Sequence, residues 1–461
     1  MSGGDKINYI IENATIVTMN EDRDILENYS IVVEGKKIFD ISDCESIQEK
    51  YDYSEYRIIS GEGNIIFPGL INNHTHLFQT LMKGLGDDMA LDRWFTEMTA
   101  PSAVHLSQEE VYHAALLGSL ESIESGTTTI MDYMYAHPRE GLSDSIIKAF
   151  QRTGIRGILA RGTHNTGEEF GNSPGIIQKK ETIVSDCKRL LSKYHKDYNN
   201  RIKIWLAPAA IWTNTEQLLK ELWELAQKFN TGMTAHVSET PFDRECSEQL
   251  HGENDINALK KYGIYGGNLL LVHCVHLSET ELDWMADEDI KISYNPVSNM
   301  YLASGIAPIT RAKNKGICVG LATDGAASNN TQNMIECLKS GALLQKVGER
   351  DPTAITAEQI LSMATIEGAK TLGLENEIGS IEAGKKADLF IYNPDRSFNS
   401  LPTFSPVSTL VYAGDQRCVE SVMIAGELIY HNCDFNGLDT KSIKERVQQT
   451  ALSLAKKAGN I

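Results

Sequence analysis

One pattern recurs through the middle of the chain: an apolar run rich in β-branched residues, followed by a helix-like stretch, at a spacing of roughly 25 to 40 residues. Between 215 and 229, Leu218, Leu222 and Leu225 fall on one helical stripe. Eight strand–helix units within about 310 residues predict a closed parallel (β/α)8 barrel of the TIM type at 66–376. The eight runs lie at 65–71, 127–133, 155–162, 202–209, 232–239, 268–275, 291–298 and 317–324.

An open doubly wound α/β sheet is the alternative to the barrel. It is less well supported, because no Gly-rich phosphate-binding loop follows the first apolar run. A chain of 461 residues suits either a large barrel with an accessory domain or two to three ordinary domains.

The two ends of the chain have a different texture from the middle. Short β-rich runs alternate with turn residues from 7 to 41, and the same texture returns at 385–393 and 419–432, where Gly426 suits a hairpin. We therefore predict an accessory β-sandwich built from 1–65 and 377–435, with strands that pair across the two termini. Residues 436–461 are predicted to form a C-terminal helix.

Composition excludes several classes of protein. Hydrophobic residues make up 41% and charged residues 23%, as in ordinary globular proteins. The net charge of -19 disfavours nucleic acid and anionic membranes as partners, and favours a neutral or cationic small molecule. The eight cysteines are scattered without C-x-x-C spacing, and no leader-like segment or run of about 18 apolar residues occurs. A cytoplasmic enzyme with reduced thiols is expected.

Polar residues that follow the apolar runs are the candidates for chemistry, because barrel active sites lie at the C-terminal ends of the strands. His74 and His76 follow the first run, His236 lies in the fifth, and Asp324 ends the eighth. Two histidines at i and i+2 on an extended segment point the same way, so both can bind one ion. Three imidazoles and a carboxylate suit zinc, with iron as an alternative.

Taken singly, each histidine is more often a hydrogen-bonded structural residue than a ligand, by about three to one. The joint pattern reverses these odds, because four of the 12 histidines, His273 included, lie at the functional ends of predicted strands. His276 is predicted to lie away from the mouth of the barrel. Surface, helix or loop roles are assigned to His105, His113, His137, His164, His195, His251 and His431.

Six ordered motifs carry a resemblance to a known family. They are FPGLINNHTH (67–76), HVSE (236–239), VHCVH (272–276), SYNPVSNMYLASGIAPI (293–309), TDGAASNNTQNM (323–334) and EIGSIEAGKKADLFIYN (377–393). Together they resemble the amidohydrolase superfamily almost from end to end. Its metal-dependent aminohydrolase branch, which includes triazine hydrolases and the deaminases of methylthioadenosine and adenosylhomocysteine, is the most similar part.

This resemblance implies a metal-bearing barrel with a β-sandwich, and it implies a role for each residue of the site. His74, His76, His236 and Asp324 would be the metal ligands, with Glu239 and His273 as catalytic neighbours. Members with two metals bridge them with a carboxylated lysine at the end of strand four. That strand here ends Ala207-Pro208-Ala209, and its only lysine, Lys203, lies near the other end, which favours one divalent ion.

The predicted reaction is hydrolytic deamination of an amino-substituted nitrogen heterocycle. A metal lowers the pKa of bound water to about 7; Asp324 would accept its proton, His273 would orient it, and Glu239 would protonate a ring nitrogen before ammonia leaves. The same fold could instead displace chloride, open a cyclic amide or deaminate methylthioadenosine or adenosylhomocysteine. A non-catalytic scaffold is the least supported reading, and a cytidine-type deaminase is excluded because the chain lacks its P-C-x-x-C ligand pair.

Substrate recognition departs from the nucleoside-directed members of the family. These hold the ribose with a glutamate after the tryptophan-containing loop and a histidine after the proline of strand four, whereas this chain has Ala103 and Ala209 there. A flat heterocycle without that clamp is therefore the expected substrate. The resemblance also implies a homo-oligomer. The candidate substrate contacts are Gln79, Trp94, Arg161 and Ser328. The last three also have structural alternatives: packing for Trp94, an ion pair for Arg161 and a helix cap for Ser328.

Overall fold

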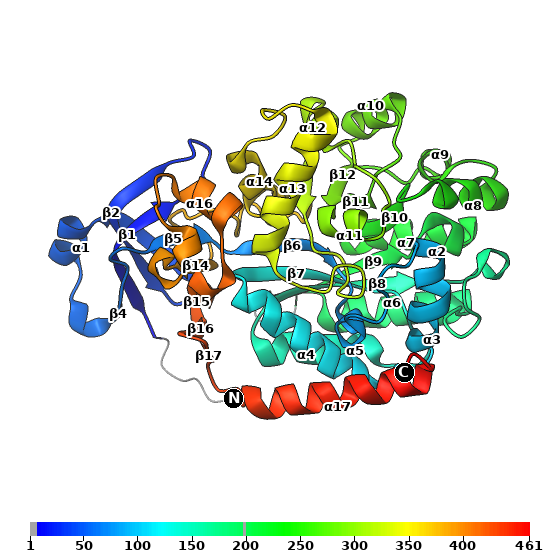
Figure 1. The fold of residues 1–461 in the computed structure, drawn as a ribbon, viewed down its shortest axis with the longest axis horizontal. Helices are drawn as coiled ribbons and strands as arrows, with labels where there is room; N and C mark the ends of the chain where they lie inside the picture. Colours follow the sequence, from blue (N-terminus) through cyan, green and yellow to red (C-terminus); the bar gives the residue numbers. More distant parts are fainter. Residues whose placement is uncertain (1–6, 197–199) are drawn as a thin grey trace.

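A computed structural model describes residues 7–196 and 200–461 (Figure 1). Its centre is a parallel sheet of eight strands, in which each strand pairs with its neighbours in sequence order. The predicted (β/α)8 barrel is therefore confirmed. The strands are β6 (Leu70–Thr75), β7 (Thr127–Met134), β8 (Arg156–Thr163), β9 (Ile202–Pro208), β10 (Met233–Val237), β11 (Leu269–His273), β12 (Lys291–Tyr294) and β13 (Val319–Leu321).

The first and last strands of the barrel meet through a short polar seam. The backbone N–H of Asp324 donates to the carbonyl of His74 over 3.1 Å. The side chain of Asn72 donates to Thr323 Oγ1 over 2.7 Å and accepts from the Thr323 backbone N–H over 3.1 Å. One amide side chain thus joins the two edges, and it brings the residues that follow β6 and β13 together.

Helices cover the outside of the barrel, which explains why β7 and β8 are buried along their whole length. The helix α4 begins in a capping box made by Ser107 and Glu110. Leu218, Leu222 and Leu225 of α7 are buried, as their spacing predicts. The main helices are α4 (Gln108–Glu124), α5 (Leu142–Thr153), α6 (Lys180–Tyr194), α7 (Glu216–Phe229), α8 (Pro241–His251), α9 (Asp255–Tyr262), α10 (Glu279–Asp287) and α13 (Met334–Glu349).

The first apolar run, predicted as one barrel strand at 65–71, is divided between two sheets. Its first half, β5 (Ile65–Pro68), pairs with strands of the accessory sheet, and only the second half is β6 of the barrel. Gly69 separates the two halves, and a Cβ at this position would overlap the side chain of Thr128. A glycine is therefore needed where the chain crosses from one sheet to the other.

The accessory sheet is a mixed sheet of nine strands built from both ends of the chain, as predicted. Its halves join where β5 pairs with β14, and the rings of Phe67 and Phe390 stack there with centroids 5.3 Å apart. The predicted hairpin turns at Ala425 and Gly426, both with positive φ. Its strands are β1 (Tyr9–Val17), β2 (Ile25–Glu34), β3 (Lys37–Asp43), β4 (Arg57–Ser60), β5, β14 (Leu389–Tyr392), β15 (Val419–Ile424), β16 (Glu427–His431) and β17 (Asp434–Phe435).

Residues 1–6, with which the predicted accessory segment begins, lie outside the described residues. The chain ends in the helix α17 (Thr440–Ala458), which runs along the barrel beside α4 (Figure 1). Its attachments include two polar contacts: His113 Nδ1 lies 2.8 Å from Thr450 Oγ1, and Lys457 pairs with Glu110 over 2.7 Å. None of the described helices combines the length and apolar character needed to cross a membrane.

Candidate metal centre and active site

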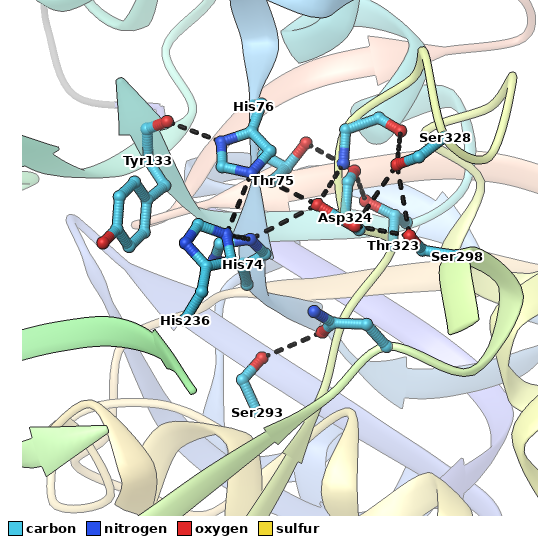
Figure 2. Close-up of polar contacts among 12 residues, drawn as sticks. His74, Thr75, His76, Tyr133, His236, Ser293, Ser298, Thr323, Asp324 and Ser328 are labelled. Carbon is cyan, nitrogen blue, oxygen red and sulfur yellow. Dashed lines mark hydrogen bonds and ion pairs between the residues drawn. The ribbon is translucent and has the colours of Figure 1, made fainter. Parts of the chain in front are cut away.

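Four side chains from three separate parts of the barrel converge at the C-terminal ends of its strands (Figure 2). His74 and His76 come from the end of β6, His236 from β10, and Asp324 from the loop after β13. His236 Nε2 lies 3.2 Å from the Nε2 atoms of both His74 and His76. Asp324 Oδ1 lies 3.3 Å from the same two atoms. The structure thus brings together the four residues predicted as a ligand set.

These distances fit the coordination shell of a small divalent cation. Ligand atoms about 2.0–2.1 Å from a tetrahedral metal ion lie about 3.3 Å from one another. His76 Nδ1 lies 2.7 Å from the Tyr133 carbonyl and His236 Nδ1 lies 2.5 Å from the Ala209 carbonyl. A carbonyl only accepts hydrogen bonds, so each Nδ1 carries the proton and each Nε2 directs its lone pair inward.

Electrostatics point to the same conclusion. Burial lowers the pKa of His74 to about 3, so this imidazole is neutral at physiological pH. Burial also raises the pKa of Asp324, but the neighbouring imidazoles of His74, His76 and His273 outweigh it and hold that pKa well below its usual range. Three nitrogen lone pairs and an ionised carboxylate this close repel one another unless a cation lies among them. The donor set therefore fits a divalent metal ion.

Asp324 is held in one orientation by two hydroxyl groups. Its Oδ1 faces the imidazoles, while Oδ2 accepts from Ser298 Oγ over 2.5 Å and from Ser328 Oγ over 3.2 Å (Figure 2). The backbone of Asp324 has a φ of +62° and that of His273 a φ of +70°. Non-glycine residues in this region carry strain that the surrounding packing must support, a feature concentrated at functional sites.

Glu239 and His273 lie beside the four converging groups. His273 Nε2 is 3.4 Å from Glu239 Oε2, and Ser304 Oγ donates to Glu239 Oε1 over 3.0 Å. Burial, followed by the charges of Asp243 and Asp324, raises the pKa of Glu239 well above its usual range, which favours the protonated form of this carboxyl. Asn299 Nδ2 lies 3.0 Å from His273 Nδ1 and donates a hydrogen bond to it. His273 Nδ1 is therefore unprotonated, and the imidazole proton is on Nε2, toward Glu239.

A cavity of about 600 Å³ opens over this centre. Gln79 lines it and donates to Tyr135 Oη over 3.1 Å, while its own buried Oε1 has no protein partner among the described residues. Trp94 and Ser328 line it as well, and Trp94 Nε1 is bonded to the carbonyl of Ala327 over 2.9 Å. Three of the four candidate substrate contacts therefore reach the cavity.

The fourth candidate, Arg161, lies outside this lining. Its guanidinium is buried and bonds to Asp186 over 3.0 Å and to Gln178 over 2.9 Å, so its contacts support a structural role. Of the two alanines at the positions of the ribose clamp, Ala209 lines the cavity, whereas Ala103 is fully buried and does not.

Sequence reasoning missed two histidines of the cavity wall. His276, predicted to lie away from the mouth, lines the cavity and has its Nε2 3.0 Å from the carbonyl of Ser304. His164 lines it too, from the loop after β8, with its Nδ1 3.1 Å from Asn172 Nδ2. The only available signal for each was its position shortly after a predicted strand.

An eight-stranded α/β barrel with buried imidazoles and a carboxylate at its strand ends is an arrangement that suits a metal-dependent hydrolase. The amidohydrolase family model matches residues 65–429, and the chain belongs to this family. It is 36% identical over 448 residues to 5-methylthioadenosine/S-adenosylhomocysteine deaminase of Thermoanaerobacter pseudethanolicus, covering 97% of this chain and 99% of that one. It is 37% identical over 395 residues to 5'-deoxyadenosine deaminase of Methanobrevibacter smithii, covering 85% and 87%.

Solved structures agree with the curated relatives. An adenosine deaminase from Xanthomonas campestris with bound zinc superimposes with a TM-score of 0.90 at 25% identity, covering 98% of this chain and 99% of that one. A mutant of atrazine chlorohydrolase from Arthrobacter aurescens, complexed with zinc and atraton, matches with the same score and identity over 96% and 100%. The protein is thus a hydrolase acting on carbon–nitrogen bonds, and the prediction of metal-dependent hydrolytic deamination is confirmed at the level of this class.

Proposed function

We propose that the protein removes the amino group of an aminopurine by hydrolysis, using one zinc ion held by His74, His76, His236 and Asp324. The observation that carries this proposal is the convergence of three Nε2 atoms and a carboxylate oxygen at 3.2–3.3 Å. The relatives named as deaminases of methylthioadenosine and deoxyadenosine favour a purine ring. The two zinc-bearing neighbours favour zinc over iron.

A single ion is proposed because β9 offers no bridging lysine at the centre. Lys203 lies on β9 but lines a separate cavity with His195, at the other end of the strand. When bound, the metal makes water nucleophilic at neutral pH by lowering its pKa. The remaining chemistry belongs to side chains of this protein.

Each of the three catalytic candidates has a role that fits its surroundings. Glu239, protonated by its burial, donates a proton to a ring nitrogen and makes the neighbouring carbon electrophilic. Asp324 takes a proton from the water that adds to this carbon, and His273 Nε2 donates a hydrogen bond to the added oxygen. Asp324 then passes its proton to the amino group, the carbon–nitrogen bond breaks and ammonia leaves. The hydroxyl proton on the added oxygen returns to Glu239, and the ring becomes a keto tautomer.

The ring, not a sugar, is the group that the inner cavity recognises in this proposal. Ala209 stands at the cavity wall where the nucleoside-directed members place a histidine, and Ala103 does not reach the cavity. Gln79 offers an unpartnered carbonyl oxygen, which can accept a hydrogen bond from a ring N–H or an amino group.

The test is ammonia release by protein whose metal has been removed with a chelator and then replaced with zinc or iron. We expect activity on aminopurines to disappear with the metal, to return with one ion per chain, and to be absent from His236→Ala. Metal-loaded protein that releases ammonia from no member of a panel of aminopurines, aminopyrimidines and aminotriazines would refute the proposed function.

Displacement of chloride from a triazine is the second candidate. It is favoured by one observation: the atrazine chlorohydrolase matches this chain with the same TM-score and identity as the adenosine deaminase. Parallel assays for chloride and ammonia on chloro- and amino-substituted triazines separate the two reactions.

A further inference from the structure

The outer part of the cavity has an aromatic wall that the chemistry at the metal centre does not use. Phe170 meets Trp212 edge-to-face with ring centroids 6.0 Å apart, and Trp212 meets Phe242 at 5.7 Å. All three rings line the cavity, and they come from the loop after β8, the loop after β9 and the start of α8. Phe242 lines the cavity and remains 39% exposed.

The charged side chains that line the cavity beside this wall are acidic. Among the described residues that line the cavity there is no lysine or arginine, whereas Asp92 and Asp243 both line it. Asp243 accepts from Trp212 Nε1 over 3.1 Å, which places a carboxylate directly beside the aromatic wall. The nearby Arg161 is bonded to Asp186, and His164 is neutral because burial, then Arg161, lowers its pKa to about 3.

The cavity is larger than one flat heterocyclic ring. A cavity of about 600 Å³ lies in the range of sites that enclose drug-sized ligands, so a single heterocycle bound at the metal centre leaves the outer part unfilled. A phosphate or carboxylate brought there would lose its hydration beside carboxylates and meet no cationic side chain. An apolar or cationic group would instead gain contact with aromatic faces.

We propose that this outer wall is a subsite for an uncharged or cationic apolar arm attached to the heterocycle, and that it rejects substrates with an anionic arm. This inference rests on the proposed function, because the ring is placed at the metal centre. The subsite is defined by Asp92, Phe170, Trp212, Phe242 and Asp243.

The experiment compares adenine with adenines that carry a benzyl, an aminobutyl or a carboxypropyl group at N9. Ammonia release by the zinc-loaded enzyme is measured for each compound. We expect kcat/KM for the benzyl and aminobutyl compounds to exceed that for adenine, and kcat/KM for the carboxypropyl compound to be at least tenfold lower than for the benzyl compound. A carboxypropyl compound that performs as well as the benzyl compound would overturn the proposal.

Two variants assign the effect to the wall. Phe242→Ala should reduce the ratio of benzyl to adenine kcat/KM by about threefold to tenfold, because one aromatic contact is lost. Phe404→Ala, which removes a 93% exposed ring outside the cavity, is the matched control and should leave that ratio unchanged. Equal ratios in both variants would contradict the placement of the arm.

Charge reversal gives an independent readout. Asp92→Lys should raise the ratio of carboxypropyl to aminobutyl kcat/KM by about threefold or more at low ionic strength, and the effect should shrink in salt. Asp287→Lys makes the same change of net charge at an exposed site on α10 away from the cavity, and should leave the ratio unchanged. If no compound releases ammonia, the proposed function fails. The subsite is then tested by calorimetric binding of the same compounds to the zinc-loaded protein, where the benzyl and aminobutyl compounds should bind more tightly than the carboxypropyl compound.

Discussion

Replacing Ser298 by alanine removes the shorter of the two hydroxyl hydrogen bonds to Asp324 without touching a proposed metal ligand. Ser298 Oγ donates to Asp324 Oδ2 over 2.5 Å, and Ser328 Oγ donates to the same oxygen over 3.2 Å. Both serines are buried, so water does not replace the lost donor freely. The oxygen that faces the imidazoles is Oδ1, which keeps its bond from the Gly325 backbone N–H at 2.7 Å.

The expected magnitude follows from the charge of the acceptor. A hydrogen bond to a charged group contributes about 1.5–3 kcal/mol, which corresponds to about 10- to 100-fold in rate if it orients the carboxylate for proton transfer. We therefore expect kcat/KM of Ser298→Ala to fall by about 10- to 100-fold while the zinc content stays near that of the wild type. The measurement is ammonia release normalised to bound zinc.

Ser293 supplies a matched control. It is also a buried serine in the same part of the barrel, but its hydroxyl donates to Asn295 Oδ1 over 3.1 Å and not to Asp324 (Figure 2). We expect Ser293→Ala to stay within about threefold of the wild type, the effect of losing an ordinary neutral hydrogen bond. The reasoning fails if Ser298→Ala stays within twofold of the wild type, or if both variants lose activity equally.

Three further predictions follow from the site and its supports. Glu239→Gln should keep its metal but lose at least about 100-fold in kcat, because an amide does not donate the proton; near-normal turnover with metal bound would exclude Glu239 as the acid. Asp388→Ala leaves the buried Arg156 without its bidentate partner at 2.9 and 3.0 Å, and should cost about 3–5 kcal/mol of unfolding free energy in urea titrations, whereas an unchanged midpoint would show that the pair contributes nothing. Burial, then Arg161, lowers the pKa of His164 from 6.5 to about 3, so between these pH values the unfolded chain takes up a proton that the folded protein does not, and stability falls as the pH drops. His164→Gln should lessen this loss of unfolding free energy by about 1 kcal/mol per pH unit between pH 5.5 and 4.5. Parallel pH profiles of the variant and the wild type would disprove the assignment.

The sequence by itself determined the barrel and the four converging residues. Parallel strands buried on both faces are rich in apolar residues, and the residues directly after them reach one face of the barrel. His74, His76, His236 and Asp324 could therefore be assigned together from eight runs and a few polar residues. The pairing of the two termini in one sheet followed from their shared β-rich texture.

Tertiary structure alone decided where runs divide and where loops lie. The run 65–71 is continuous in apolar character, and its division into β5 and β6 follows from the different sheets with which its two halves pair. His164 and His276 resemble other loop histidines in sequence, because local pattern carries no information on how a loop folds over the barrel mouth. Among the described residues, no lysine or arginine lines the cavity, and this depends likewise on contacts made across the fold, such as the pairing of Arg161 with Asp186.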